Sequence, residues 1–170
     1  MAKISGNIKA AFVGIMLFLL ICNDNSFGAE ASEGLHANKD IPNITSSELK
    51  KKIRSYRDTV VVVDFFATWC PPCKDEIPGF ISLYDRFKDK DVEIIGIALD
   101  FEGSSVVKPF ANRMGINYPL FIGGHDMNEE YDVTGIPTTL IFNKDGNLKV
   151  RHVGYASEKE FETDIKKLLK

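Results

Sequence analysis

Hydrophobic residues gather in two short, nearly continuous runs, at residues 59–66 and 92–99. Both runs are rich in β-branched side chains, and polar residues do not alternate regularly with apolar ones in either. A run of this length and composition is typical of a strand that is buried on both faces of a sheet. We therefore predict two buried strands at these positions.

Apolar residues elsewhere recur at the spacing of an α-helix. The pattern predicts helices at residues 45–56, 70–87, 104–114 and 157–169. The first and the last begin with a capping-box sequence, in which Thr or Ser is followed three residues later by Glu. The last helix carries one apolar stripe, which indicates that a single face of it packs on the sheet. Its members are Phe161, Ile165, Leu168 and Leu169.

Two further strand-like segments, 138–142 and 148–153, flank a turn that contains Asp145-Gly146. This arrangement is typical of a β-hairpin. A short extended piece is predicted at residues 118–122. The chain then reads as a β-α-β unit, a further helix, a hairpin and a closing helix. We predict an α/β fold in which a central mixed β-sheet is flanked by helices on both faces.

The N-terminal residues 1–31 are predicted to be a signal peptide or a membrane anchor. Lys3 and Lys9 provide a positive start, residues 10–21 are apolar, and an Ala-x-Ala sequence follows. Cys22 directly follows the apolar run's last residue and offers a third alternative, a lipidated leader. Each of these alternatives places the folded part of the chain outside the cytoplasm.

Residues 32–43 are polar and rich in helix-breaking residues, so we expect a flexible spacer there. A single folded domain is then assigned to residues 44–170. The formal net charge of the whole chain is −3 and no basic stripe is visible, so nucleic acid is not an expected partner. The chain has three cysteines, one of them in the leader, which excludes a scaffold held by several disulfides.

The sequence Trp69-Cys70-Pro71-Pro72-Cys73 stands between a predicted strand and a predicted helix. Two thiols at this spacing can close into a disulfide and exchange it with other thiols. Cys70 falls at the helix N-terminus, where the helix dipole favours a thiolate. We therefore predict that Cys70 is the exposed attacking thiol and that Cys73 resolves the mixed disulfide. Pro72 suits the first helical turn, and the two prolines stiffen the ring that the disulfide closes.

Two other interpretations of this cysteine pair remain open. A zinc site needs about four ligands, but the three histidines are scattered and no second cysteine pair exists. A purely structural disulfide between such near neighbours closes a short loop and stabilises little. The position of the pair, between the end of a buried strand and the start of a helix, favours thiol–disulfide exchange.

Two carboxylates lie close to the cysteine pair in the sequence. Asp64 interrupts the apolar run before it, and burial there raises the pKa of a carboxyl. Such an acid could accept the proton of Cys73 during resolution; the alternative is a solvated carboxylate at the strand end. Glu76 lies one helical turn beyond Cys73. It either tunes the thiols or is an ordinary surface carboxylate.

Ile136-Pro137 directly precedes the first hairpin strand. A proline here is either a tolerated edge residue or the second residue of a cis peptide bond. The cis form would bring the Ile136 backbone beside the thiols, free to pair with an extended substrate chain. We predict that Ile136, Pro71 and Pro72 contact the substrate.

Together these residues resemble the thioredoxin superfamily. The segment Asp64–Lys74 is similar to its active-site segment, which includes Trp69, and Gly135–Thr139 is similar to its cis-proline segment. Within the superfamily, residues 69–78 fit the WCxxCxxExP pattern of the extracytoplasmic TlpA/ResA type. Residues 101–122 resemble the insertion of that type.

The resemblance implies thiol–disulfide exchange, usually as a reductant, in the bacterial periplasm or on the outer face of the cytoplasmic membrane. It implies that Cys70 is the nucleophile, Cys73 the resolving thiol and Asp64 the buried proton acceptor. Glu76 matches the active-site glutamate of the TlpA/ResA type, and Pro137 matches the cis-proline. No metal and no cofactor are expected.

The partners implied by the resemblance are cysteine-containing proteins, among them apocytochrome c during cytochrome c maturation. A membrane thiol reductant would return the electrons, and the N-terminus could tether the protein to the membrane. The chain departs from the TlpA/ResA pattern at Asp64, where many members have a neutral residue. The dipeptide Pro71-Pro72 also occurs in cytosolic tryparedoxin-like proteins, from which the leader separates this chain.

Two other functions remain as alternatives. A thiol peroxidase of the same fold would carry a Pro-x-x-x-Thr-x-x-Cys loop, and residues 64–68 have no such proline. A copper-carrying thiol chaperone would space its cysteines one residue wider and add a distal histidine. His125 is available for that role, although no sequence feature places it near the thiols.

Overall fold

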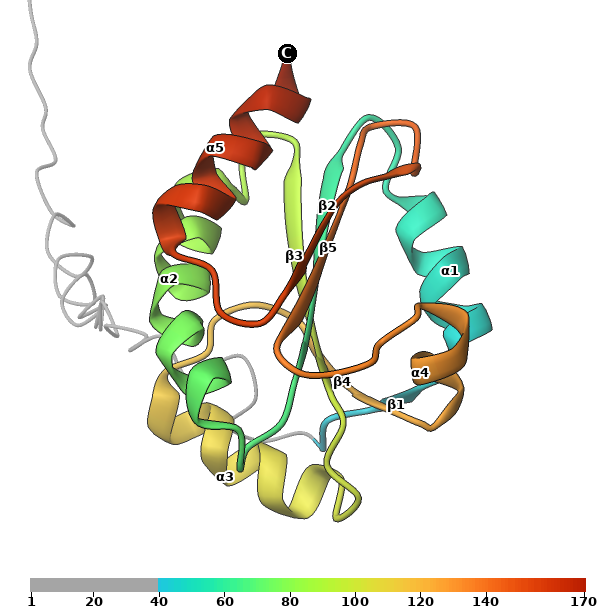
Figure 1. Ribbon diagram of the computed structural model, residues 1–170, viewed down its shortest axis with the longest axis vertical. Helices are drawn as coiled ribbons and strands as arrows, with labels where there is room; N and C mark the ends of the chain where they lie inside the picture. The colour runs from blue at the N-terminus through green and yellow to red at the C-terminus, as the bar shows by residue number, and fades with distance from the viewer. Residues whose placement is uncertain (1–39) are drawn as a thin grey trace, which may run out of the picture. The chain divides into compact units, whose positions relative to one another are not determined.

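A six-stranded mixed sheet forms the centre of the protein in the computed structural model, which describes residues 40–170 (Figure 1). The spatial order of the strands is β1-β4-β3-β2-β5-β6. The first three pairings in this order are parallel and the last two are antiparallel. The strands are β1 (Asn43–Ile44), β2 (Val60–Phe66), β3 (Val92–Ala98), β4 (Leu120–Gly123), β5 (Thr138–Phe142) and β6 (Leu148–Val153).

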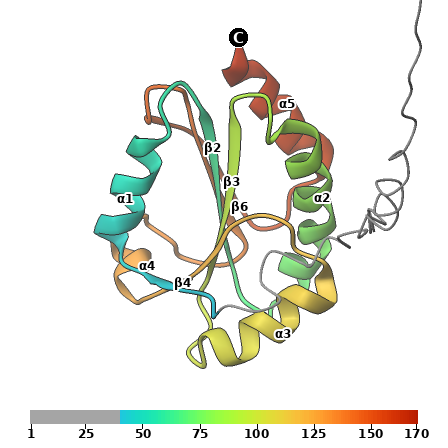
Figure 2. The same ribbon diagram turned by 180° about the vertical axis from the view of Figure 1, so that it is seen from behind.

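Within residues 40–170, five helices lie on the two faces of this sheet. The two opposite views show helices on both sides (Figure 1 and Figure 2). One face carries α2, α3 and α5, and the other carries α1 and α4. The predicted α/β fold with a mixed sheet between helices is therefore confirmed. The helices are α1 (Ser46–Ser55), α2 (Pro71–Phe87), α3 (Ser104–Met114), α4 (Asp126–Glu130) and α5 (Glu158–Leu169).

The central position of β2, between β3 and β5, explains why its sequence is a continuous apolar run. All seven of its residues are buried. Val60 and Val62 contribute to the core beneath α2 and α5, whereas Val61 and Val63 contribute to the core beneath α1. Successive side chains of a strand point to opposite faces, so a strand between two helical layers needs apolar residues at nearly every position. Asp64 is the exception, a polar residue that is buried together with its apolar neighbours.

The predicted hairpin strands have the bounds that the structure shows, and both predicted capping boxes are present. Two short elements were not predicted, β1 and α4. The two residues of β1 and the five of α4 are too few to display a periodic pattern. The sequence segment 101–122, expected as an insertion, contains α3 and most of β4.

The expectation of a flexible spacer up to residue 43 is wrong at its C-terminal end. Ile41 is buried in the core, and its backbone N–H donates to Ser104 Oγ at 2.9 Å. Asn43 pairs with Ile122 in the sheet. Ile41 and Ile44 are apolar residues within a polar stretch, and burying them fixes the chain between them. The fold therefore begins before residue 44.

The predictions for residues 1–31, including the leader and Cys22, lie outside the described residues, as does most of the predicted spacer. Within residues 40–170, no helix is both long enough and apolar enough to span a membrane. The assignment of the leader stays a prediction.

Candidate active site

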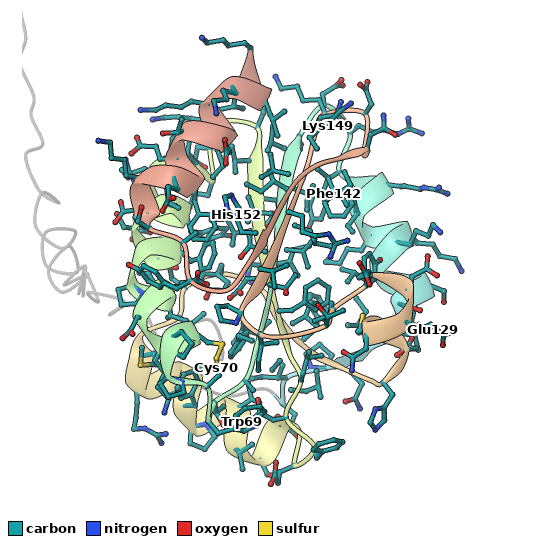
Figure 3. The ribbon with its side chains drawn as sticks, viewed as in Figure 1. Trp69, Cys70, Glu129, Phe142, Lys149 and His152 are labelled. Carbon is teal, nitrogen blue, oxygen red and sulfur yellow. A yellow bond between two sulfur atoms is a disulfide. The ribbon has the colours of Figure 1, made fainter. Side chains whose placement is uncertain are left out.

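The cysteine pair lies where β2 ends and α2 begins. Cys70 is the N-cap of α2 and has an extended backbone conformation. The structure joins Cys70 and Cys73 in a disulfide, with their Cα atoms 5.4 Å apart. The backbone N–H of Cys73 donates to Cys70 Sγ at 3.3 Å, which is the contact that a thiolate at a helix N-terminus would strengthen. Figure 3 shows this disulfide at the end of α2, with Trp69 next to it.

Cys70 and Cys73 differ less in their solvent exposure than the sequence predicts. Cys70 is 3% exposed and Cys73 is 1% exposed. The prediction of an exposed Cys70 is therefore wrong for the oxidised form. Trp69 is 64% exposed and Pro71 is also exposed, so the residues on either side of Cys70 form the visible surface. At the N-cap position the Cys70 side chain lies against the first turn of α2, where its sulfur accepts from the Cys73 N–H.

A buried carboxylate braces the loop that precedes the cysteine pair. Asp100 follows β3 and is 3% exposed. Both of its oxygens accept from the backbone N–H of Thr68, at 3.2 and 3.1 Å, and Oδ1 also accepts from Thr68 Oγ1 at 2.6 Å. This contact was not predicted, because the ends of two parallel strands meet only in the fold. The contact fixes the backbone two residues before Cys70.

Asp64 lies in the buried centre of the sheet, on the face covered by α2. It is 1% exposed, and its neighbours in register are Gly96 of β3 and Thr139 of β5. Burial, with the Glu76 carboxylate as the second cause, raises the pKa of Asp64 well above its usual value. The alternative of a solvated carboxylate at a strand end is wrong.

Glu76 is also buried, in the first turns of α2, and is 3% exposed. Its Oε1 accepts from the backbone N–H of Ala156 at 2.5 Å. Burial raises the pKa of Glu76 to about 7, and the hydrogen bond from Ala156 opposes that rise. The alternative of a surface carboxylate is wrong. Asp64 on β2 and Glu76 on α2 are therefore both buried, in the two elements that flank the cysteine loop, and the charge of Glu76 acts on Asp64.

A fully buried tyrosine, Tyr118, lies where the charges of both acids act on it. It was not predicted from the sequence. Tyr118 packs over Gly96, where an added Cβ would lie 3.1 Å from Tyr118 Cε2 and 2.4 Å from Leu120 Cδ2. Burial, followed by the charges of Asp64 and Glu76, raises the pKa of Tyr118 well above its usual value. The glycine within the apolar run of β3 was the available signal, since a glycine in a strand often marks a close approach.

The bond between Ile136 and Pro137 is cis, as predicted. Pro137 is buried, and its carbonyl accepts from the backbone N–H of Gly154 at 2.8 Å. Thr138 pairs with Phe65 in register, so Pro137 lies beside the end of β2 from which the cysteine loop departs. Among residues 40–170, no backbone hydrogen bond outside the helices and strands involves Ile136.

The histidine proposed for the copper alternative is engaged elsewhere. The His125 ring packs against the ring of Phe101, with centroids 5.4 Å apart, and lines a pocket with Leu99 and Asn128. Within the part of the chain that the structure describes, no group of three or more His, Cys, Asp or Glu side chains is gathered as a metal site would require.

The comparisons with known proteins agree with this geometry. Residues 37–151 match the AhpC/TSA family. A thiol-disulfide oxidoreductase ResA of Bacillus thuringiensis (strain Al Hakam) is 31% identical over 140 residues, which cover 80% of each chain. A solved thiol:disulfide interchange protein of the thioredoxin family from Chlorobium tepidum TLS is 30% identical, with a TM-score of 0.63, over 68% of this chain and 83% of that one. StoA from Bacillus subtilis shares the fold at 24% identity and a TM-score of 0.56, over 63% of this chain and 82% of its own.

The mixed sheet and the cysteine pair at the start of α2 define a thioredoxin-like thiol–disulfide oxidoreductase. The chain belongs to the AhpC/TSA family, and its relatives place it with the oxidoreductases of the ResA type.

Proposed function

We propose that this oxidoreductase reduces disulfides in protein substrates outside the cytoplasm. The observation that carries the proposal is a pair of buried acids, Asp64 on β2 and Glu76 on α2, in the two elements that flank a disulfide at a helix N-terminus. Exchange needs a stabilised thiolate and a nearby group that accepts and returns a proton. The N-cap supplies the first of these, and the acid pair supplies the second.

In the proposed reaction, the Cys70 thiolate attacks one sulfur of the substrate disulfide. The substrate S–S bond breaks, the first substrate thiolate leaves and is protonated, and a mixed disulfide joins Cys70 to the second substrate sulfur. Cys73 then loses its proton to Asp64 and attacks Cys70 Sγ. The mixed disulfide breaks, the second substrate thiolate leaves, and the Cys70–Cys73 disulfide seen in the structure forms. Two electrons have passed to the substrate, and a thiol reductant must return two to the protein.

The substrate chain would lie against Ile136 and the two prolines of the cysteine loop. Ile136 is half-buried and the cis bond precedes a buried Pro137, while Pro71 is exposed and Pro72 is half-buried. An extended substrate could therefore pair with the Ile136 backbone and reach Cys70 between these surfaces. Apocytochrome c is the substrate that we propose within this class, because its cysteines must be reduced before haem attachment.

The test compares Cys70→Ser and Cys73→Ser in the reduction of insulin. We expect both variants to lose activity, because the first lacks the attacking thiol and the second cannot resolve the mixed disulfide. Only Cys73→Ser should accumulate a covalent adduct with the substrate, visible by non-reducing electrophoresis. Full activity of Cys70→Ser would refute the proposal. Consumption of peroxide well above the rate of free cysteine would favour the thiol peroxidase alternative.

The location of the domain is tested separately. We propose that residues 1–31 direct it to the bacterial periplasm or to the outer face of the cytoplasmic membrane, either as a cleaved signal or as an anchor. Fusion of alkaline phosphatase after residue 170 should give an active reporter in cells. The same fusion with residues 1–31 removed should be inactive, because that reporter needs an oxidising compartment for its own disulfides.

A further inference from the structure

A groove of about 520 Å³ lies between the cysteine loop and α3. The cysteine loop contributes Thr68, and the start of α2 contributes Lys74. Val106, Phe110, Arg113 and Met114 line the side formed by α3. Both ribbon views show α3 beside the first turns of α2 (Figure 1 and Figure 2). The groove therefore begins at the backbone that carries the reactive cysteines.

The floor of this groove is apolar and firmly packed. Phe110 is buried and lies against Phe66, with ring centroids 6.2 Å apart. Val106 and Met114 are half-buried and pack against the same core. A floor of this kind can bury small apolar side chains of a bound polypeptide without a rearrangement of the fold.

The rim of the groove is cationic, although the whole chain has a formal net charge of −3. Lys74 and Arg113 stand on opposite walls, one on α2 and one on α3. Neither takes part in a salt bridge with another residue of 40–170. A carboxylate that enters the groove would therefore meet two cations without breaking an existing ion pair.

The acids nearest in sequence do not line the groove. Asp100 is buried behind Thr68 and accepts three hydrogen bonds from it. Asp75 and Glu102 are exposed and lie outside the groove lining. The lining itself contains no carboxylate, so the local field favours an anionic occupant.

We propose that this groove binds a segment of the protein substrate in which carboxylate side chains alternate with small apolar ones. The proposal rests on the proposed function, because it names a substrate feature for the same active site. Thr68 stands two residues before Cys70, and Lys74 directly follows Cys73. A segment held there lies next to the substrate cysteine, so its charge contributes to the choice of disulfide.

The test uses the full-length chain. The reduced protein is mixed with two peptide disulfides that differ only in carrying Asp or Asn beside the cysteine. We expect wild-type protein to reduce the Asp peptide with a kcat/KM roughly two- to fivefold higher at low salt, the range expected for exposed ion pairs. The ratio should fall towards one in about 0.5 M NaCl, because salt screens exposed charges.

We choose Arg113 rather than Lys74 for substitution, because Lys74 directly follows Cys73 and Arg113 is far from the cysteines in the sequence. Arg113→Gln should lower the ratio, Arg113→Glu should bring it below one, and Arg113→Lys should largely retain it. The matched control is Lys108→Gln on the same helix. Lys108 pairs with Asp40 at 3.7 Å and does not line the groove, so its loss should leave the ratio unchanged.

Equal rates for the two peptides with wild-type protein would overturn the groove proposal and leave the proposed function intact. An equal drop in Lys108→Gln and Arg113→Gln would overturn it too, because a general charge effect would then explain the ratio. Arg113-dependent binding to phosphatidylglycerol vesicles, with equal peptide rates, would assign the groove to a membrane surface instead. Reduction of neither peptide would refute the proposed function itself.

Discussion

Glu76 and Ala156 lie 80 residues apart in sequence and are joined by a hydrogen bond of 2.5 Å from the Ala156 N–H to Glu76 Oε1. The bond connects the helix that carries the cysteines to the loop that leads into α5. It orients one carboxylate oxygen, while Glu76 Oε2 is buried without a hydrogen-bond partner among residues 40–170. The ionised form of Glu76 is thus only partly compensated, which is why its pKa is raised to about 7.

The first prediction concerns stability against pH. A carboxyl whose pKa is raised on folding makes the folded state bind more protons than the unfolded state, so stability falls as pH rises. For Glu76, the fall begins near the usual pKa of 4.5 and is complete above the folded pKa of about 7. The two values imply a loss of about 3 kcal/mol across this window. Urea unfolding of the oxidised protein at several pH values measures it.

The matched variant for this prediction is Glu76→Gln, which can still accept the hydrogen bond from Ala156. Its free energy of unfolding should change less with pH in the same window. Asp75→Asn is the control, because Asp75 is the exposed neighbour of Glu76 on α2. If the free energy of unfolding of Glu76→Gln fell with pH as steeply as that of the wild type, Glu76 would be ionised at little cost in the fold.

The second prediction separates the two roles of Asp64. Burial raises the pKa of Asp64 well above its usual value, so ionising this carboxyl in the fold is unfavourable. Asp64→Asn removes that cost, so the variant should be more stable than the wild type at neutral pH in the oxidised form. The same variant should slow resolution of the mixed disulfide by on the order of a hundredfold, because the base that accepts the Cys73 proton is lost. Single-turnover kinetics with a trapped peptide measure the second effect. A stabilised variant with an unchanged resolution rate would remove Asp64 from the proposed mechanism.

The strands could be predicted because burial on both sides leaves a continuous apolar run, as in β2. The burial of Asp64 could be suspected for the same reason. The burial of Glu76 was left open, although a signal was present. Cys73, Ile77 and Phe80 are buried at helical spacing, and Glu76 lies within that stripe. A carboxylate on the apolar face of a helix indicates burial before any coordinates are known.

Other parts of the site could not be predicted from one sequence. Asp100 acquires its role through a contact with Thr68, which is distant from it along the chain. Nothing in its local sequence distinguishes Asp100 from an exposed loop aspartate. Gly96 could have indicated a close approach within the sheet, but not that Tyr118 makes it. The low exposure of Cys70 was also missed, because the sequence predicts the helix N-cap but not how its side chain is covered.

The third prediction concerns the brace between Asp100 and Thr68. Thr68→Val removes the 2.6 Å hydrogen bond from Oγ1 but keeps the two backbone contacts, so we expect a loss of about 1 kcal/mol of unfolding free energy. Asp100→Ala leaves the Thr68 amide without its buried acceptor and should lose roughly 2–3 kcal/mol. Urea unfolding of the oxidised forms measures both values. Equal losses would mean that the backbone contacts contribute nothing beyond the hydroxyl.

The fourth prediction concerns the close packing beside the acid pair. Gly96→Ala would place a Cβ 2.4 Å from Leu120 Cδ2 and 3.1 Å from Tyr118 Cε2, so those side chains must move. Such overpacking should lower the unfolding free energy by about 1–3 kcal/mol. Tyr118 is not among the causes that raise the pKa of Asp64 or Glu76. The pH window set by Glu76 should therefore persist in the variant.

Gly135→Ala is the matched control for this substitution. A Cβ at Gly135 would meet no atom within 4 Å, and its backbone is outside the left-handed region. We expect its unfolding free energy to stay within about 0.5 kcal/mol of the wild type, as for most exposed positions. If Gly96→Ala were equally neutral, the strand β3 would have to yield at its contact with Leu120. That result would contradict the close packing of Leu120 and Tyr118 on Gly96.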